Sequence, residues 1–584
     1  MDLRMSTRTQ LAQSIVEALA TYGVETTAET VEATFAVPPK PELGDISIPT
    51  FVWAKALRSP PPKIAADLVE KLNETIANIP DIQALSALGP YINVRLDPLA
   101  RARRVLHAAA TEDFGQQDIG AGKRIGVDFS SPNIAKPFGI GHLRSTAIGN
   151  SLVRTYQKLG YDVISFNHLG DWGTQFGKLM SAYERWGDDE KLEETPILHL
   201  YDLYVHFHQL AKDSPELGLE DEGRAWFKRL EDGDPQAQAY WERFRELSLR
   251  EFERIYKRLD VRFDHYWGEA YYNNMLDQLI EDVRTKGLLV ESEGAQVVPM
   301  DELNLPPCLI VKNDGATLYA TRDLAAARYR EEQYGFEKFL YVVGAEQNVH
   351  FQQVFEVLKK MDYPWAKTLH HIPFGRIHGI STRKGTLVFL DDILERGSQR
   401  VRDILADRNL PDELRETIVE NVTVGAVIFY DLSRGRIKNY DFDWDQMLRG
   451  LGPNERGQTG PYLQYTHTRL ASLLETYQER YGELPAVEDV DLSLLNDEGA
   501  RGIVAHIERF PEAIRQAAQN DEPSVLSRYA IDIAELFNGY YSGGHRIVSD
   551  DPNLSAARIA LARATRVALA ESLRLLGVPL PPKM

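Results

Sequence analysis

The stretch RIGVDFSSPNIAKPFGIGHLRST, residues 124–146, decides the fold. Its first six residues have the short apolar character of a buried strand, and a turn-rich loop follows them. The apolar pattern then becomes helical from about His142 to Leu159, and residues 161–166, YDVISF, predict a second strand. Strand, helix and strand in succession predict a βαβ unit with parallel strands, and therefore a Rossmann-like sheet.

The loop between the first strand and the helix is a candidate nucleotide site. Free backbone N–H groups and the helix dipole favour an anion at this junction of a parallel sheet. Gly139 and Gly141 allow close approach of a ligand to the backbone. His142 can donate a hydrogen bond to a phosphate or ribose oxygen, and Lys136 can add a positive charge. The spacing matches neither G-x-G-x-x-G nor a P-loop.

The regions around this unit differ in pattern. Residues 1–115 predict a small α+β domain, with helical spacing near the N-terminus and a strand at 91–96, YINVRL. Residues 119–397 predict the sheet domain, with a charged helical insertion at about 185–300 and further strands at 308–312 and 339–343. Residues 398–584 read almost entirely as helix and predict a bundle. The predicted fold class is multidomain α/β: a Rossmann-like parallel-sheet domain, an N-terminal α+β domain and a C-terminal α-helical bundle.

Composition limits the classes of partner. The chain has 584 residues, 66 Lys and Arg against 86 Asp and Glu, and a formal charge of −20. Such a charge disfavours nonspecific coating of nucleic acid and argues against DNA, but a basic stripe on an acidic body still attracts phosphate locally. A single shaped RNA site therefore remains compatible with the composition.

Cysteine usage and hydropathy indicate the compartment. The single cysteine, Cys308, excludes an internal disulfide and fits a reducing cytosol. No cysteine–histidine cluster has zinc spacing, so we expect no zinc and no other protein-held metal. No run approaches the roughly 18 apolar residues of a membrane helix, and no secretory signal opens the chain. We expect a cytoplasmic protein that does not bind membranes.

The motifs together resemble a known family. Residues 130–146, SSPNIAKPFGIGHLRST, resemble the HIGH signature of class I aminoacyl-tRNA synthetases in the form that arginyl-tRNA synthetases carry. Residues 167–178, NHLGDWGTQFGK, and 459–469, TGPYLQYTHTR, resemble the same family, as does the C-terminal LRLLGVPLPPKM. One position departs: the signature normally begins with histidine, and Gly139 stands there. A donor to a charged oxygen contributes roughly 1.5–3 kcal/mol, so its loss predicts slower turnover.

The second family motif, KMSKS, has its best match at residues 379–385, GISTRKG. Thr382 replaces the second lysine, and the resemblance implies that Lys136 compensates. Ser381 would contact ATP, while Arg383 and Lys384 would supply charge to the leaving pyrophosphate.

The resemblance also implies an arginine pocket. Guanidinium has five donors in a planar fork, so a well-placed carboxylate recognises it bidentately. Tyr319 and Asp323 in LYATRDLAAA lie four apart and would share one helix face. Gln347 in GAEQNVHFQQVF would line the same pocket. Asp128 and Asn133 fall where the family places polar contacts to the amino acid.

Contacts with tRNA are implied in two regions. Tyr462 and Tyr465 with Arg469 form an aromatic and basic set of the kind that stacks unpaired bases and holds phosphate. Asn93 matches a position in the N-terminal domain that can read a base.

The implied activity is ATP-dependent ligation of L-arginine to tRNA(Arg) through arginyl-adenylate, with Mg²⁺ accompanying ATP and the enzyme acting as a monomer. Family members usually need bound tRNA before they activate arginine. Three alternatives stay open: a class I synthetase for another amino acid such as cysteine or glutamine, an inactive synthetase-like tRNA-binding protein, and a nucleotidyltransferase of the same fold without RNA.

Overall fold

The computed structural model describes residues 7–36, 38–76, 79, 81–313, 315–379, 389–406, 410–450 and 457–583. Two compact units form the chain. The first comprises Met1–Phe114, Thr466–Pro511 and Asp532–Glu571, and the second comprises Gly115–Tyr465, Glu512–Ile531 and Ser572–Met584. Each is described separately.

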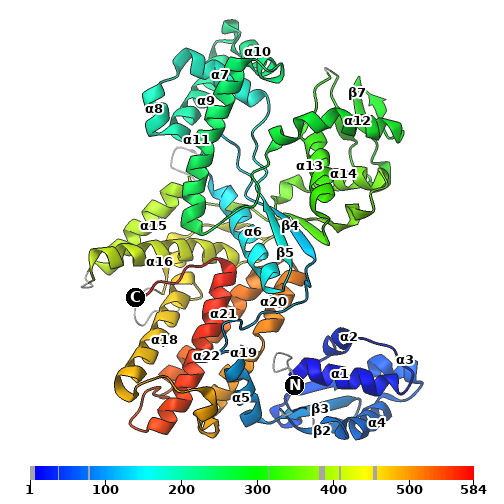
Figure 1. Ribbon diagram of the computed structural model, residues 1–584, viewed down its shortest axis with the longest axis vertical. Coiled ribbons are helices and arrows are strands. Elements are labelled where there is room, and N and C mark those ends of the chain that lie inside the picture. The colour runs from blue at the N-terminus through cyan, green and yellow to red at the C-terminus, as the bar shows by residue number, and fades with distance from the viewer. Residues whose placement is uncertain are drawn as a thin grey trace. The chain divides into compact units, whose positions relative to one another are not determined.

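The second unit is built around a parallel sheet. Its strand order is β10-β9-β4-β5, with all three neighbouring pairs parallel. The strands are β4 (Arg124–Asp128), β5 (Asp162–Phe166), β9 (Lys338–Tyr341) and β10 (Leu369–His371). Helix α6 (Ile140–Lys158) connects β4 to β5, and the three lie close together in Figure 1. The predicted βαβ unit is confirmed.

Helix α6 packs directly against the residue that follows β4. A Cβ added at Gly149 would lie 2.2 Å from the Phe129 side chain, so only glycine lets the helix backbone approach this ring. Phe129 is fully buried. This contact sets the distance between the sheet and the start of the helix, where the candidate nucleotide loop lies.

Two groups of elements lie between β5 and β9 in the sequence, and Figure 1 shows them as separate clusters. The first is helical and contains α7 (Thr174–Trp186), α8 (Asp189–Glu194), α9 (Pro196–Asp213), α10 (Leu219–Glu231) and α11 (Pro235–Leu259). The second contains the 3₁₀ helix η5 (Glu269–Met275), α12 (Leu276–Thr285), β6 (Val290–Ser292), β7 (Ala295–Val298), β8 (Cys308–Val311) and α13 (Tyr319–Tyr334). The strand expected at 308–312 is present, but it belongs to an antiparallel β6-β7-β8 sheet and not to the parallel sheet.

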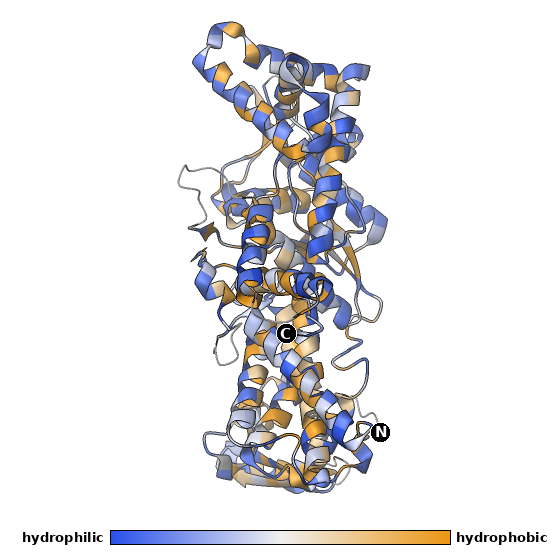
Figure 2. Cartoon of the chain, turned by 90° about the vertical axis from the view of Figure 1, so that its left-hand side faces the viewer, coloured by the Kyte–Doolittle hydropathy of each residue, from blue (hydrophilic) through white to orange (hydrophobic). Residues whose placement is uncertain are grey.

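After β9 come α14 (Asn348–Lys360), β10 and a short parallel pair formed by β11 (Ile377–His378) and β12 (Tyr440–Asp441). The later helices of this unit are α15 (Leu390–Leu405), α16 (Asp412–Leu432) and α17 (Trp444–Leu448). Residues of both units form α18 (Gly460–Tyr481), α20 (Phe510–Gln519), α21 (Ser524–Ser542) and α22 (Pro552–Leu576). Figure 2 shows apolar and hydrophilic residues mixed along the helices of the chain. In α15, for example, Leu390, Ile393, Leu394 and Val401 are buried at helical spacing.

The first unit contains a three-stranded antiparallel sheet of order β1-β3-β2. Its strands are β1 (Ile46–Pro49), β2 (Ile82–Leu88) and β3 (Tyr91–Leu96), and its helices include α1 (Thr7–Ala20), α2 (Ala28–Glu32), α3 (Ala54–Leu57), α4 (Pro61–Asn73), α5 (Pro98–Ala108) and α19 (Glu498–Glu508). Apolar residues of α1, α4 and the strands form one core, including Leu11, Ile15, Leu68 and Ile92. In the same unit the Arg104 guanidinium of α5 pairs with Asp81 and with Glu508 of α19.

The predicted fold class is therefore confirmed, whereas the domain boundaries at 115–119 and 397–398 stay predictions. Among the described residues, none of the helices has the length and apolar character that crossing a membrane requires.

The contact at Gly149 makes a prediction about stability. Replacing a helical glycine with alanine normally stabilises by about 0.5–1 kcal/mol. At Gly149 the added methyl group collides with Phe129, so we expect Gly149→Ala to lower the free energy of unfolding by about 1–3 kcal/mol. Thermal unfolding would measure the change.

Gly502 in α19 is the matched control, because a Cβ there meets no atom within 4 Å. Gly502→Ala should leave the melting temperature unchanged or raise it. Equal effects of the two substitutions would contradict the packing argument.

Candidate active site

The loop between β4 and α6 has an unusual backbone. Ser130, Ser131 and Ala135 have φ angles of 71°, 50° and 57°, which residues with a side chain seldom adopt. Buried hydrogen bonds hold it there: Ser145 Oγ accepts from the Ser130 N–H at 2.9 Å, and Ser248 Oγ accepts from the Ala135 N–H at 2.8 Å. Strained backbone held by its surroundings is typical of functional sites.

The start of α6 presents a neutral histidine. His142 Nδ1 accepts a hydrogen bond from the Gly139 N–H at 3.2 Å, so the ring proton lies on Nε2. Burial, with the nearby charge of Lys136, lowers the pKa of His142 to about 4. The ring is therefore uncharged at neutral pH and can donate from Nε2. A Cβ at Gly141 would meet no protein atom within 4 Å, which leaves open space beside this turn.

Lys136 lies at the same loop and faces the helical insertion. Its Nζ lies 5.2 Å from the centre of the Tyr204 ring on α9. Partial burial lowers the pKa of Lys136. An ammonium group that is short of water gains most when an anion approaches it.

Asp128, at the end of β4, is paired with other residues of the protein. Its Oδ2 accepts from Arg330 Nη1 at 2.6 Å, and its Oδ1 accepts from Ser131 Oγ at 3.0 Å. Both Asp128 and Arg330 are buried. The carboxylate is thus neutralised by the protein's own guanidinium, so its predicted contact with a free amino acid competes with this pair.

Tyr319 and Asp323 are brought together as the helical spacing predicts. Asp323 Oδ2 lies 2.6 Å from His350 Nε2, and the Tyr319 ring centre lies 4.9 Å from that of His350. Although burial raises the pKa of Asp323, the hydrogen bond from His350 and nearby positive charge outweigh it, and the pKa is lowered. Tyr319 is 57% exposed, which leaves its phenol available to a ligand.

The other two predicted arginine contacts lie on loops beside the sheet. Asn133 forms an isolated parallel bridge with Gly170, and a Cβ at Gly170 would lie 2.0 Å from Asn133 Oδ1. Gln347 ends the 3₁₀ helix η7 (Ala345–Gln347) directly before α14 and is exposed.

Glu269, at the start of η5, is a site residue that the sequence reasoning missed. Burial and then the charge of Asp323 raise the pKa of Glu269 to about 8, while Arg322 acts in the opposite direction. Two carboxyl groups close enough to perturb each other mark a place where a cation would bind. A lone glutamate in the loop WGEA carries no periodic signal that could have identified it.

The predicted residues Ser381, Arg383 and Lys384 lie outside the described residues. The segment before them, which contains β11, is joined to α6 by Arg144, the second residue after His142. Its guanidinium donates to the Gly375 and Lys438 carbonyls at 2.8 and 3.0 Å and pairs with the buried Asp431 of α16 at 2.8 Å.

Among the predicted RNA contacts, two are buried. Asn93 on β3 is 3% exposed and Tyr462 on α18 is 8% exposed, so neither side chain reaches the surface in this structure. Asn93 Oδ1 is buried without a hydrogen-bond partner among the described residues. Tyr465 and Arg469 are partly exposed, and Arg469 donates to Asn538 Oδ1 at 2.7 Å.

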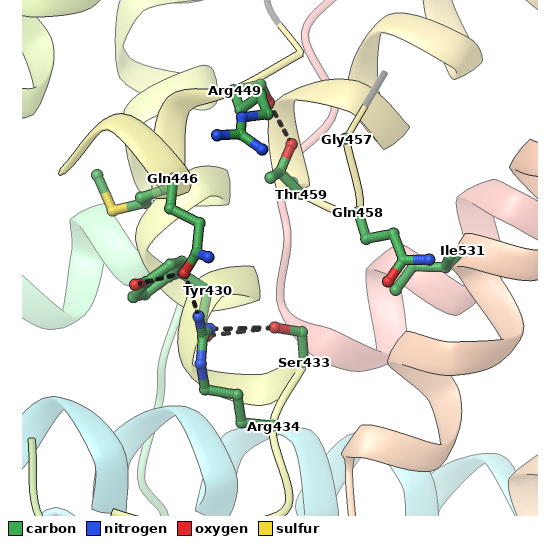
Figure 3. A pocket seen from close by; sticks show the side chains of 11 residues that line it. Tyr430, Ser433, Arg434, Gln446, Arg449, Gly457, Gln458, Thr459 and Ile531 are labelled. Atoms are coloured by element: carbon green, nitrogen blue, oxygen red, sulfur yellow. Dashed lines mark hydrogen bonds between the residues drawn. The ribbon is translucent and has the colours of Figure 1, made fainter. Parts of the chain in front are cut away.

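A pocket of about 420 Å³ lies near the start of α18, between residues of α16, α17 and α21 (Figure 3). Polar and apolar groups line it in similar measure, with two arginines among the lining residues: Tyr430, Ser433, Arg434, Gln446, Met447, Arg449, Gly457, Gln458, Thr459, Gly460 and Ile531. Arg434 donates to Gln446 Oε1 at 3.0 Å and lies over the Tyr430 ring. Across the described ranges, no group of three or more His, Cys, Asp or Glu could hold a metal ion.

Comparison with known proteins agrees with this geometry. The family model described as tRNA synthetases class I (R), catalytic domain, matches residues 105–444. The parallel sheet, the loop before α6 and this match define a class I aminoacyl-tRNA synthetase. An arginyl tRNA synthetase N terminal domain matches 9–96, and a DALR anticodon binding domain matches 463–584.

Relatives that match almost the whole chain show to which class I family it belongs. An arginine–tRNA ligase of Exiguobacterium sp. is 45% identical, with 96% of this chain and 97% of that one covered. One from Clostridium perfringens is 42% identical, with 96% and 98% covered. The chain belongs to the arginyl-tRNA synthetase family. The solved Thermus thermophilus arginyl-tRNA synthetase has the same fold, with a TM-score of 0.80 at 23% identity, and the match covers 99% of this chain and 100% of that one.

The neutral state of His142 makes a prediction. Loss of a donor to a charged oxygen costs roughly 1.5–3 kcal/mol, so we expect His142→Ala to slow ATP–pyrophosphate exchange about 10- to 100-fold. Because the pKa of His142 is about 4, the contribution of His142 to the exchange rate should be constant between about pH 6 and about pH 8.

The control is arginine binding, which His142→Ala should leave unchanged. A rate that titrates with His142 near neutral pH, or exchange that survives the substitution intact, would contradict the assignment.

Proposed function

We propose that the chain ligates L-arginine to tRNA(Arg) with ATP, releasing AMP and diphosphate. The observation that carries the choice of amino acid is the pair of interacting carboxyl groups, Asp323 and Glu269. They suit a guanidinium, whose donors form a planar fork. Membership of the family supports the rest of the reaction.

The chemistry has two steps. A carboxylate oxygen of arginine attacks the α-phosphorus of ATP, the bond to the bridging oxygen breaks, and diphosphate leaves. The terminal ribose hydroxyl of tRNA then attacks the arginyl carbonyl, and AMP leaves. The protein forms no covalent bond, so positioning and charge stabilisation supply the rate. Mg²⁺ arrives with ATP.

Named groups divide this work. His142 Nε2–H donates to a phosphate or ribose oxygen, and the Lys136 ammonium stabilises charge on the phosphates. Arg383 and Lys384, with Ser381, are proposed to act on the leaving diphosphate. Gly139 and Gly141 would line the site where ATP binds.

Arginine recognition is assigned to the polar residues at the carboxyl edge of the sheet. Asp323 and Glu269 would receive the guanidinium, and Tyr319 and Gln347 would complete this end of the site. Asn133, with Asp128 held by Arg330, would face the α-amine end. The buried Asp128–Arg330 pair supports an indirect part for Asp128, since its carboxylate already has a partner.

Binding of tRNA is proposed at two places. The pocket with Arg434 and Arg449 suits an unpaired nucleotide, because guanidinium groups pair with phosphate and stack on bases. Tyr462 and Tyr465 are proposed to take part in this contact, and Arg469, which belongs to the first unit, is proposed as a separate RNA contact. The unpartnered Oδ1 of Asn93 would accept from a base, which needs a shift of its neighbours. We further propose a cytoplasmic monomer that requires tRNA for activation.

Three alternatives compete with this proposal. A class I synthetase for cysteine or glutamine has no use for two interacting carboxyl groups, and a substrate screen would decide the matter. An inactive tRNA-binding protein, suggested by Gly139, would bind tRNA without forming adenylate. A nucleotidyltransferase without RNA does not account for the anticodon-binding domain match.

The raised pKa of Glu269 makes arginine binding depend on pH. Below about pH 8 this carboxyl is protonated, and a bound guanidinium would lower its pKa and expel the proton. Arginine affinity should therefore rise with pH to about 8, by up to about tenfold per unit, and then level off. Calorimetry in buffers of different ionisation enthalpy would measure the released proton.

Glu269→Gln is the control: it should weaken binding, abolish the proton release and flatten this pH dependence. Proton release that persists in Glu269→Gln would assign it to another group.

The central experiment is an arginylation assay with ATP and tRNA. Gly139 has φ −82° and ψ 162°, a conformation that histidine also adopts. We expect Gly139→His to raise the rate of adenylate formation by about tenfold, the gain of one donor to a charged oxygen. Absence of arginyl-tRNA from both proteins would overturn the proposed function.

A further inference from the structure

The Asp323 carboxylate is held by two imidazole rings from different elements, and neither ring has a part in the reaction described above. His350 Nε2 lies 2.6 Å from Oδ2, and His168 Nε2 lies 3.5 Å from Oδ1. We propose that His350 and His168 are positioning residues that fix the orientation in which Asp323 receives the guanidinium. This inference rests on the proposed arginine site.

His350 lies on α14, one turn after Gln347, and joins two residues of that site. Its Nε2 contacts Asp323, and its ring packs against Tyr319, with 4.9 Å between ring centres. The imidazole is mostly buried, while 22% of the Asp323 side chain stays exposed. His350 thus fixes one carboxylate oxygen of Asp323, while the carboxylate remains accessible to a ligand.

Arg330 contacts a ring nitrogen of His168 and can take part only as a hydrogen-bond donor. Arg330 Nη2 lies 3.1 Å from His168 Nδ1, and a guanidinium only donates. When His168 Nδ1 accepts this bond, the ring proton lies on Nε2, the nitrogen that faces Asp323. The Trp267 carbonyl is also 3.1 Å from Nδ1 and would become its partner only if that nitrogen were protonated.

These contacts form a continuous chain across four elements. It runs from Asp128 at the end of β4 through Arg330 on α13, then His168 after β5, then Asp323 on α13, and ends at His350 on α14. An aspartate otherwise rotates freely about its terminal torsion. Bidentate recognition needs both oxygens coplanar with the guanidinium, so holding the carboxylate beforehand removes an ordering cost from binding.

The test compares arginine binding and kinetics in four variants of the full chain. His350→Leu keeps the volume but removes the donor, and His350→Gln restores an amide donor near the Nε2 position. We expect His350→Leu to raise KM and Kd for arginine about tenfold, the loss of one hydrogen bond to a charged group, with kcat and the KM for ATP within about twofold. His350→Gln should recover most of the affinity.

His371→Leu is the matched structural control. His371 on β10 is also partly buried, packs on Phe351, and its Nε2 lies 3.1 Å from the Val343 carbonyl oxygen. It should change the melting temperature as much as His350→Leu does, but not the KM for arginine. Equal losses of affinity in His350→Leu, His350→Gln and His371→Leu would reduce His350 to a packing residue and overturn the inference.

Asp323→Asn separates this inference from the function beneath it. If Asp323→Asn leaves arginine binding intact, the proposed arginine site itself is wrong. If Asp323→Asn abolishes binding but His350→Leu does not weaken it, the site stands and the positioning role is overturned.

Discussion

The buried ion pair between Asp128 and Arg330 is the constraint on which the site depends. It joins the last residue of the central strand β4 to α13, and both side chains are almost fully removed from water. Breaking one partner of such a pair typically costs about 3–5 kcal/mol, because the other charge is left buried. Ser131, Tyr272 and His168 share the remaining hydrogen bonds. Since Asp323 precedes Arg330 by seven residues, or two helical turns, fixing Arg330 also fixes the carboxylate that faces the ligand.

A second buried guanidinium performs the equivalent task on the nucleotide side. Arg144 follows His142 by two residues and contacts both β11 and β12 regions and Asp431 on α16. Tyr440 donates to the same Asp431 carboxylate at 2.8 Å. Each half of the site therefore depends on one arginine whose charge is neutralised by a buried aspartate of the protein. The loop before α6 keeps three non-glycine residues at positive φ because buried hydrogen bonds to Ser145 and Ser248 hold its backbone.

The sequence predicts the parts whose signals are local. The βαβ unit follows from two apolar strands around a helical pattern, and the Tyr319–Asp323 pairing follows from helical spacing, so both could be read in advance. The residues that contact one another across the fold could not be predicted from the sequence. The pairing of Asp128 with Arg330, 202 residues away, leaves no local signal in the sequence, and Glu269 carries no pattern at all. Residues 308–312 have the apolar character of a strand, but that character does not say which sheet the strand joins.

In the proposed arginine site, the charges of the side chains would distinguish the two ends of arginine. Asp323 is held ionised by its histidine neighbours, whereas Glu269 retains its proton to about pH 8, so the free site carries one negative charge from this pair near neutral pH. His142 is uncharged, so the ATP end offers a directed donor rather than a second fixed cation beside Lys136. A free arginine carboxylate would therefore be repelled from the acidic end and attracted to the ammonium group of Lys136, beside which the phosphates of ATP are proposed to bind. The same arrangement disfavours the reverse orientation, because a guanidinium placed beside Lys136 would meet a like charge.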